Sequence, residues 1–285
     1  MSADAIVGAA RARRARLARS SPLLWAAGAI LAAAVVAALF GPLLAPADPN
    51  AADLNNQFVG PVPGHPLGFD GQGRDLLSRL LEGARTSMLG PAVVVALAMT
   101  AGVLLATVAA WRGGWVDSVV GTALDILFAF PGILLAILSA AVFGASLWAA
   151  TLALAIAYMP YIARVLRSAA VRERAQEYIA AAEVQGLSVV AICGRHLIPN
   201  VAPLIVAQGT LLFGYAMVDL AAISFIGLGV QPPQADWGVM VATGKGGVLQ
   251  GYPAESLSAG VCIVLVVVAV NLLGERLGDR REARP

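Results

Sequence analysis

Length and composition exclude most classes of protein. The chain has 285 residues, of which 59% are apolar and 13% are charged, and its mean hydropathy is +0.80. Soluble domains carry about 25% charged residues, so this composition predicts an integral membrane protein and excludes a soluble enzyme. The formal net charge of +2 is too small to indicate nucleic acid or another polyanion as a partner.

Six apolar stretches are candidate membrane spans, since a helix needs about 20 apolar residues to cross a bilayer. The third and fourth belong to one long run, which the turn signal Gly144-Ala145-Ser146 divides. Pro131 and Pro160 fall inside these two spans and are expected to kink them. In chain order, the expected spans are 23–44, 86–111, 115–143, 147–163, 197–230 and 256–274.

Arginine placement sets the expected orientation, because cytoplasmic loops of membrane proteins are enriched in Lys and Arg. With the N-terminus in the cytoplasm, fifteen of the 19 Lys and Arg residues fall on the inner side, so both termini are expected inside. The expected organisation is a basic cytoplasmic N-terminus (1–22), a first transmembrane helix (23–44), an external loop with an amphipathic helix (45–85), a five-helix core (86–275) and a cytoplasmic tail (276–285). The core includes a cytoplasmic loop at 168–199 and an external loop at 230–255.

The cytoplasmic loop 168–199 carries the clearest local signals. It begins with helix formers, and Gly186 is placed to end that helix as a C-terminal cap. A short apolar helix is expected over 187–192, followed by a second break, and Pro199 marks the start of the next span. A short apolar helix in water needs a cover, which is either a partner protein or the membrane surface; a partner is the favoured alternative.

The spacing of this loop resembles a known family. Ala181-Ala182, three residues, Gly186, twelve residues and Pro199 are similar to the EAA loop of ATP-binding-cassette importer permeases. In that family the loop forms a coupling helix that sits in a groove of the ATPase subunit. Ala180 stands where the family usually has Glu. The resemblance assigns ATPase coupling to Ala181, Ala182, Glu183, Gly186, Leu187, Val190, Arg195 and Pro199.

Two further stretches resemble the branch of the family that carries dipeptides, oligopeptides and nickel. Residues 65–85 are similar to the external segment before the second span, and residues 224–238 are similar to the external end of the fifth. The basic N-terminus, the single first span and the short C-terminus resemble the C-type permease subunit, which pairs with a B-type one. The resemblance implies an all-α, six-span, MetI-like bundle of the type I importer kind.

The external loops hold a set of polar and aromatic candidates. Residues 75–85 are expected to form an amphipathic helix lying at the outer membrane interface. The segment is either a docking surface for an external substrate-binding protein or a cap that seals the bundle, and both alternatives stay open. The docking candidates are Arg74, Asp75, Arg79 and Trp237.

Acidic residues inside spans are costly, so they face protein or water. Asp125 and Asp219 are such residues, and each either lines a translocation path or fixes helix packing; packing is favoured for both. If Asp219 lines the path, it could meet the amino group of a peptide. Ser224 and Phe225 complete the path candidates.

The sequence shows no motif for ATP binding, metal binding or catalysis. The only Gly-Lys pair, Gly244-Lys245, lacks the spacing and the Ser or Thr of a phosphate-binding loop. His65 and His196 are expected on opposite sides of the membrane and cannot share a metal. No catalytic residue, metal site or cofactor is therefore expected in this chain, and the resemblance implies that partner ATPases bind ATP and Mg.

The sequence is thus identified as a permease subunit of an ATP-driven importer in the inner membrane of a bacterium. The resemblance implies four partners besides the lipid bilayer: a B-type permease, two ATPase domains or subunits and an external binding protein that delivers di- or oligopeptides. Two alternatives remain. One is a secondary transporter or channel, and the other is a membrane scaffold that recruits an ATPase without transporting.

Overall fold

The structure, a computed structural model, describes residues 22–282 and their side chains as far as Arg276. This part of the chain is helical, apart from loops and two isolated bridges. Five helices are long and apolar enough to cross a membrane, and one bent pair makes a sixth candidate. The all-helical, multi-span class predicted from the sequence is confirmed. Nearly all of the expected basic N-terminus (1–22), and the end of the tail, lie outside the described residues.

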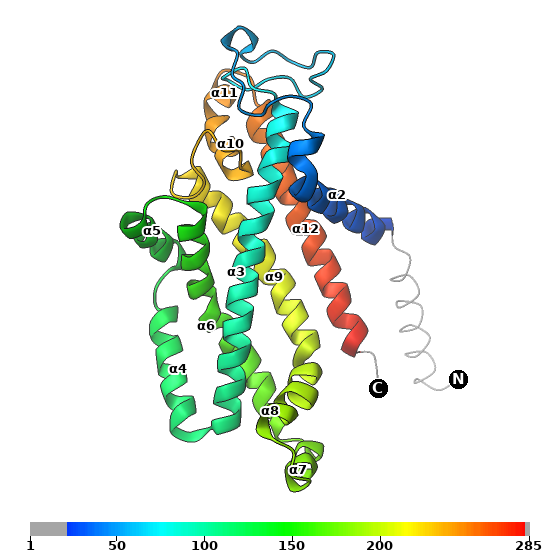
Figure 1. The fold of residues 1–285 in the computed structure, drawn as a ribbon, viewed down its shortest axis with the longest axis vertical. Coiled ribbons are helices and arrows are strands. Elements are labelled where there is room, and N and C mark those ends of the chain that lie inside the picture. Colours follow the sequence, from blue (N-terminus) through cyan, green and yellow to red (C-terminus); the bar gives the residue numbers. More distant parts are fainter. Residues whose placement is uncertain (1–21, 283–285) are drawn as a thin grey trace, which may run out of the picture.

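The helices fall into three groups (Figure 1). The long helices are α2 (Pro22–Leu44), α3 (Leu76–Arg112), α6 (Leu147–Arg174), α9 (Ile198–Phe225) and α12 (Ala254–Glu282). The bent pair is α4 (Gly114–Phe128) and α5 (Gly132–Phe143). The short elements are a 3-10 turn (Leu54–Asn56), α7 (Glu177–Val184), α8 (Val189–Ile192), a π-helix (Cys193–Leu197), α10 (Trp237–Thr243) and α11 (Lys245–Leu249).

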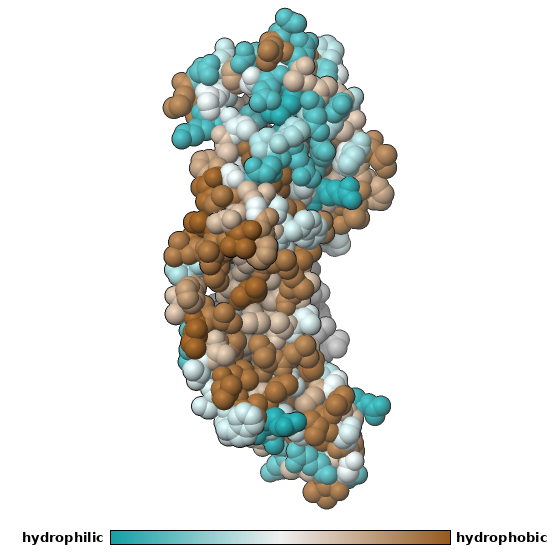
Figure 2. All heavy atoms as spheres, turned by 60° about the vertical axis from the view of Figure 1, so that its left-hand side comes forward, coloured by the Kyte–Doolittle hydropathy of each residue, from teal (hydrophilic) through white to brown (hydrophobic). Residues whose placement is uncertain are grey.

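The molecule is elongated and its two ends differ. Residues 45–75 cover one end together with α10 and α11, which we call the capped end, while α7 and α8 project from the other, which we call the loop end (Figure 1). Figure 2 shows an apolar belt over the middle of one face, with polar residues gathered toward both ends. This distribution fits a bundle whose middle lies in lipid, since lipid favours apolar side chains wherever they face it.

α3 lies at the centre of the bundle and packs closely on α6. Small residues allow this approach: a Cβ on Gly102 would lie 2.6 Å from the Cγ2 of Ile162. Ala98 and Ala106 are buried in the same layer, with Ile162 and Leu166 opposite them. Small residues at helix contacts are the usual means by which membrane helices pack without a hydrophobic driving force between them.

The expected interfacial helix at 75–85 is not a separate element. These residues form the first turns of α3, which begins after Asp75 and continues without a break to Arg112. The loop between α9 and α10 covers this segment, where a Cβ on Gly83 would lie 3.3 Å from the backbone of Asp236. Leu76 and Leu80 of this segment are therefore buried against protein instead of the membrane interface.

The third expected span is broken. α4 and α5 meet at an angle of 78°, and Pro131 is the N-cap of α5. A proline has no N–H for the preceding turn and disfavours helix at the residue before it, so the break falls at the expected position but is sharper than a kink. Pro160, in contrast, lies inside α6 without ending it.

The expected break between the loop helix and the fifth span is also absent. The π-helix Cys193–Leu197 carries α8 directly into α9. One extra residue per turn is accommodated without losing the helical hydrogen bonds, which is the usual form of a π-bulge. α8 is thus continuous with a membrane helix, while the break at Gly186 separates it from α7.

Candidate functional site

Gly186 makes the turn at the end of α7. Its φ is +79°, a left-handed conformation that glycine adopts without steric cost. The N–H of Gly186 donates to the carbonyl of Glu183 at 3.0 Å, and the N–H of Leu187 donates to the carbonyl of Ala182 at 3.2 Å. These two bonds form a Schellman motif, so the residue that the sequence marks as a break is the one that turns the chain.

The buried side of this loop fastens it to the bundle. Ile179, Ala182 and Ile192 form a buried cluster against which Leu187 and Trp111 pack. Trp111 belongs to the last turn of α3, so the cluster joins the loop to the central helix. The guanidinium of Arg174, at the end of α6, lies 4.7 Å from the centre of the Trp111 ring, and its Nη1 donates to the carbonyl of Ala110 at 2.9 Å.

A polar joint holds the loop to α6 and α9. The Nδ2 of Asn200 donates to the Oε1 of Glu173 at 2.8 Å and to the hydroxyl of Tyr178 at 2.5 Å. Tyr178 also donates to Glu173. Burial and the hydrogen bond to Glu173 raise the pKa of Tyr178, so its hydroxyl keeps the proton that this joint needs. The sequence did not single out these three residues, because their spacing of 5 and 22 positions has no local pattern.

The outer side of the loop is exposed and apolar. Val184 is 90% exposed and Val190 is 83% exposed. Of the predicted coupling residues, only Ala182 is buried and Leu187 is half-buried. The others, Ala181, Glu183, Gly186, Val190, Arg195 and Pro199, are exposed. The loop therefore presents an unpaired apolar surface beyond the end of the bundle, where it is accessible to a partner.

The path candidate Asp219 lies in a groove between helices. The groove has a volume of about 450 Å³ and lies between the α4–α5 break, α6 and α9. The Oδ2 of Asp219 accepts a hydrogen bond of 2.6 Å from the hydroxyl of Tyr158. Ser224 is buried, and its Oγ accepts from the N–H of Val230 at 3.3 Å. Phe225 is exposed at the end of α9.

Asp125 lies away from this groove and has a basic partner. Its Oδ1 accepts a hydrogen bond of 2.6 Å from the Nη2 of Arg164 on α6. Asp117, near the start of α4, makes an ion pair with Arg167 through two hydrogen bonds. These pairs tie the first half of the broken span to α6. Arg164 and Arg167 follow Asp125 by 39 and Asp117 by 50 positions, so no sequence pattern could match them.

All four docking candidates are buried in the capped end. Arg74 is 4% exposed, Asp75 2%, Arg79 0% and Trp237 3%. Their side chains contact the chain itself and leave little surface for another protein. This placement favours the second alternative, in which the segment is a cap.

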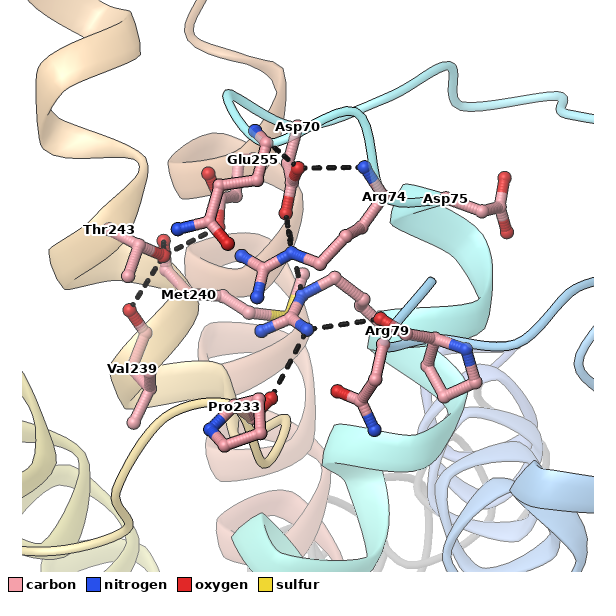
Figure 3. A network of polar contacts seen from close by, with 12 residues as sticks. Asp70, Arg74, Asp75, Arg79, Pro233, Val239, Met240, Thr243 and Glu255 are labelled. Atoms are coloured by element: carbon pink, nitrogen blue, oxygen red, sulfur yellow. Dashed lines mark hydrogen bonds and ion pairs between the residues drawn. The ribbon is translucent and has the colours of Figure 1, made fainter. Parts of the chain in front are cut away.

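A buried charge network builds this cap (Figure 3). The Oδ2 of Asp70 accepts a hydrogen bond of 2.7 Å from the Nε of Arg74 and lies 3.6 Å from the Nε of Arg79. The Nη1 of Arg79 donates to the carbonyls of Pro49 at 3.1 Å and Pro233 at 3.4 Å. Arg79 thus joins three segments that are distant in the sequence.

A second set of hydrogen bonds seats α10 on α3. The Oδ1 of Asp236 caps α10 by accepting from the N–H of Gly238 at 2.9 Å, and its Oδ2 accepts from the hydroxyl of Ser87 at 2.8 Å. Burial raises the pKa of the Asp236 carboxyl, and these hydrogen bonds oppose that rise. The indole Nε1 of Trp237 donates to the carbonyl of Leu80 at 3.0 Å.

Metal-ligating residues do not gather in the described part of the chain, where no group of three His, Cys, Asp or Glu could hold an ion. His65 instead lies 2.8 Å from a carboxylate oxygen of Asp75 in the cap. His196 lies in the π-helix at the loop end, 6.1 Å from Tyr178 between ring centres.

Two family models match the chain. Residues 73–284 match the family described as binding-protein-dependent transport system inner membrane component. Residues 13–61 match the N-terminal transmembrane domain of oligopeptide transport permease C. Together the two matches cover the first span, the central bundle, the loop end and the capped end apart from residues 62–72.

Several relatives are similar over most of their length. The dipeptide transport system permease protein of Alkalihalophilus pseudofirmus is 36% identical over 250 residues, which cover 88% of this chain and 82% of that one. The probable D,D-dipeptide transport system permease protein of Escherichia coli is 36% identical, with 92% and 87% covered. The di/tripeptide transport system permease protein of Pseudomonas aeruginosa is 36% identical, with 86% and 82% covered.

A solved structure shares the fold. A chain of the methionine ABC transporter MetNI, determined in inward-facing conformations, superposes with a TM-score of 0.55 at 21% sequence identity. The match covers 72% of this chain and 96% of that one. At this identity the likeness shows the fold alone. With the family match over residues 73–284, the chain belongs to the family of binding-protein-dependent transport system inner membrane components, the permeases of ABC importers.

Proposed function

We propose that this chain is one of two permease subunits of an ATP-driven importer of di- or oligopeptides. It forms half of the translocation path and couples that path to two cytoplasmic ATPases. A B-type permease supplies the other half, and an external binding protein delivers the peptide. The relatives named for dipeptide and di/tripeptide transport support the substrate class.

The observation that carries this proposal is the exposed apolar surface of the loop end. Val184 and Val190 are 90% and 83% exposed, on a loop whose other side is packed against Trp111 of α3. An apolar surface held rigidly beyond the bundle is suited to a partner that must push on it. The coupling residues Ala181, Glu183, Gly186 and Arg195 lie around this surface, exposed to the same partner.

The contacts on the buried side of the loop can transmit a movement of the ATPases to the membrane helices. Movement of α7 and α8 acts on α3 through Trp111. It acts on α6 and α9 through Tyr178 of α7, which is hydrogen-bonded to Glu173 and Asn200. Closure of the ATPases around ATP and Mg would shift the loop and, with it, these three helices. The helices then switch the path between inward-facing and outward-facing arrangements by rigid-body movement, the usual form of such transitions.

The orientation follows from the same assignment. The loop end faces the cytoplasm, where the ATPases reside, and the capped end faces the outside. Both termini are then cytoplasmic, as arginine placement predicts. Since the four predicted docking residues are buried, the binding protein docks on the surface of the cap while Arg74 and Arg79 hold that surface in shape from beneath.

Affinity purification from the native membrane in mild detergent tests the assignment. We expect a second permease and two ATPase domains to co-purify with one copy of this chain. Val190→Glu places a charge in the apolar contact and should reduce ATPase recovery by about tenfold, the factor given by 1.4 kcal/mol. Val248→Glu, an equally simple change at the exposed α11 of the capped end, is the matched control and should leave recovery unchanged.

Other outcomes favour the two alternatives. A solitary chain without ATPase, and peptide uptake that persists after ATP depletion, would indicate a secondary transporter or channel. ATPase that binds the complex in proteoliposomes without any flux of peptide would indicate a scaffold. ATP-dependent uptake that Val190→Glu leaves at the wild-type level would show that the coupling surface lies elsewhere.

A further inference from the structure

The groove beside α9 has an unusual lining. Most of its residues are apolar or aromatic, including Phe128, Phe130, Tyr161 and Tyr215. Asp219 is the only acidic residue in the lining, and the lining has no Lys, Arg or His. A carboxylate in an apolar groove within a membrane span is costly to keep, and such residues are therefore functional by default.

The position of Asp219 sets its depth in the bundle. It lies six residues before Phe225, the last residue of α9, which is about 9 Å along the helix axis at 1.5 Å per residue. The carboxylate is therefore inside the span, toward the capped end. A ligand entering from that end would meet it soon after leaving the cap.

The hydrogen-bonding of Asp219 is incomplete. Its Oδ2 accepts from the hydroxyl of Tyr158 at 2.6 Å, which holds the carboxylate in one orientation. No other hydrogen bond and no ion pair to Asp219 occurs among the described side chains. Its Oδ1 is not among the buried atoms that lack a partner, so this oxygen is accessible from the groove.

One basic side chain contacts the lining of the groove from outside and is already paired. The guanidinium of Arg164 lies over the ring of Phe128 at 4.7 Å, and Phe128 lines the groove. Arg164 is, however, paired with Asp125 at 2.6 Å. The carboxylate of Asp219 is thus left for a cation from outside the described chain.

The broken span keeps the groove open. α5 turns away from α4 by 78°, and the residues of the turn, Phe130 to Gly132, form one wall of the groove. The break therefore borders a space of about 450 Å³ whose opposite side includes Asp219.

We propose that Asp219, positioned by Tyr158 and surrounded by aromatic rings, is a subsite for the α-ammonium group of a peptide in the translocation path. An ammonium group satisfies the open carboxylate oxygen by a charge-assisted hydrogen bond, and aromatic faces favour a cation beside them. Apart from Asp219 and the three tyrosines Tyr158, Tyr161 and Tyr215, the lining is apolar, so the charged end of the peptide is the main feature that this groove recognises. This inference rests on the proposed function.

Photolabelling tests the subsite directly. Tyr215, which is 59% exposed and lines the groove, is replaced by benzoylphenylalanine in the complex with the partner permease and ATPases. The binding protein is left out, so that its own selectivity plays no part. The purified complex is irradiated with millimolar radiolabelled trialanine or with N-acetyl-trialanine.

We expect trialanine to label the chain and N-acetyl-trialanine to label it about tenfold less, as for loss of one charge-assisted hydrogen bond. Asp219→Asn should lower labelling by trialanine to the level of the acetylated peptide, and Asp219→Glu should restore most of it. Asp48→Asn, which removes an exposed carboxylate from the external loop, should label as the wild type.

Three results would overturn the subsite: equal labelling by the two peptides, no labelling by either, or wild-type labelling of Asp219→Asn. Loss of the partner permease from the Asp219→Asn complex would also overturn it, because the carboxylate would then pair with a cation of that subunit. ATP-driven uptake by the wild-type complex is measured separately. Uptake without labelling contradicts only the subsite, whereas labelling without uptake contradicts only the proposed function.

Discussion

At the scale of single residues, backbone conformation decides which positions are sensitive to substitution. Gly186 has φ +79°, and an added Cβ there would meet no atom within 4 Å. A substitution at Gly186 therefore costs backbone strain and no steric overlap. Gly102 is the opposite case, because its backbone is ordinary helix but a Cβ would lie 2.6 Å from Ile162. The two glycines are required for different physical reasons.

Gly186→Val should uncouple ATP hydrolysis from uptake while the protein stays in the membrane. A left-handed conformation costs about 1–2 kcal/mol in a residue with a Cβ, and more in a β-branched one, so the turn between α7 and α8 shifts. Gly186→Asn is the control, since Asn adopts this conformation readily. Uptake and ATPase activity are measured in proteoliposomes, and unchanged uptake in Gly186→Val would argue against a coupling role.

At the scale of elements, the broken third span depends on tertiary contacts for its position. α4 has a single fully buried residue, Leu124, so packing alone holds it weakly. Its two ion pairs with α6 differ in exposure: the side chains of Asp117 and Arg167 are 23% and 39% exposed, and those of Asp125 and Arg164 are 70% and 50% exposed. The first pair is therefore the less exposed of the two.

A double-mutant cycle should rank the two pairs. We expect Asp117→Ala and Arg167→Ala to show a coupling free energy of about 1 kcal/mol, near the upper limit for partly exposed pairs. The cycle at Asp125 and Arg164 should give less than half of that. Thermal unfolding of the complex in detergent provides the four stabilities of each cycle. Equal coupling free energies would mean that the exposure of the side chains does not determine how strongly each pair stabilises the protein.

At the scale of the whole molecule, the two ends differ in which residues they bury and which they expose. The capped end buries its charges: Asp70, Arg74 and Arg79 are each less than 5% exposed. The loop end exposes apolar residues, including Val184 and Val190. A rigid cap and an open loop are suited to a subunit that keeps one surface fixed and receives force at the other.

Arg79→Met should destabilise the whole capped end. Removing one partner from a buried ionic network costs about 3 kcal/mol, at the lower limit here because Arg74 remains on Asp70. Thermal unfolding and proteolysis of the loop 45–75 are the measurements, and both should report earlier opening. Arg85→Met, a change at an exposed position on the same helix, is the control. Equal stability of the two variants would show that Arg79 does not hold the cap together.

Features that depend on local chemistry could be predicted from the sequence. Composition and apolar runs predicted a membrane bundle, and the first apolar run forms the helix α2 (Pro22–Leu44). Gly186 and Pro131 marked two turns, because glycine favours a left-handed C-terminal cap and proline disfavours continuation of the helix that precedes it. The pairing of polar residues, in contrast, depends on how the helices pack. Tyr158 and Asp219 are 61 positions apart, and Arg79 and Pro233 are 154 apart. The burial of the cap could not be predicted from the sequence either, because Arg79 is covered by segments that reach it only when the chain is folded.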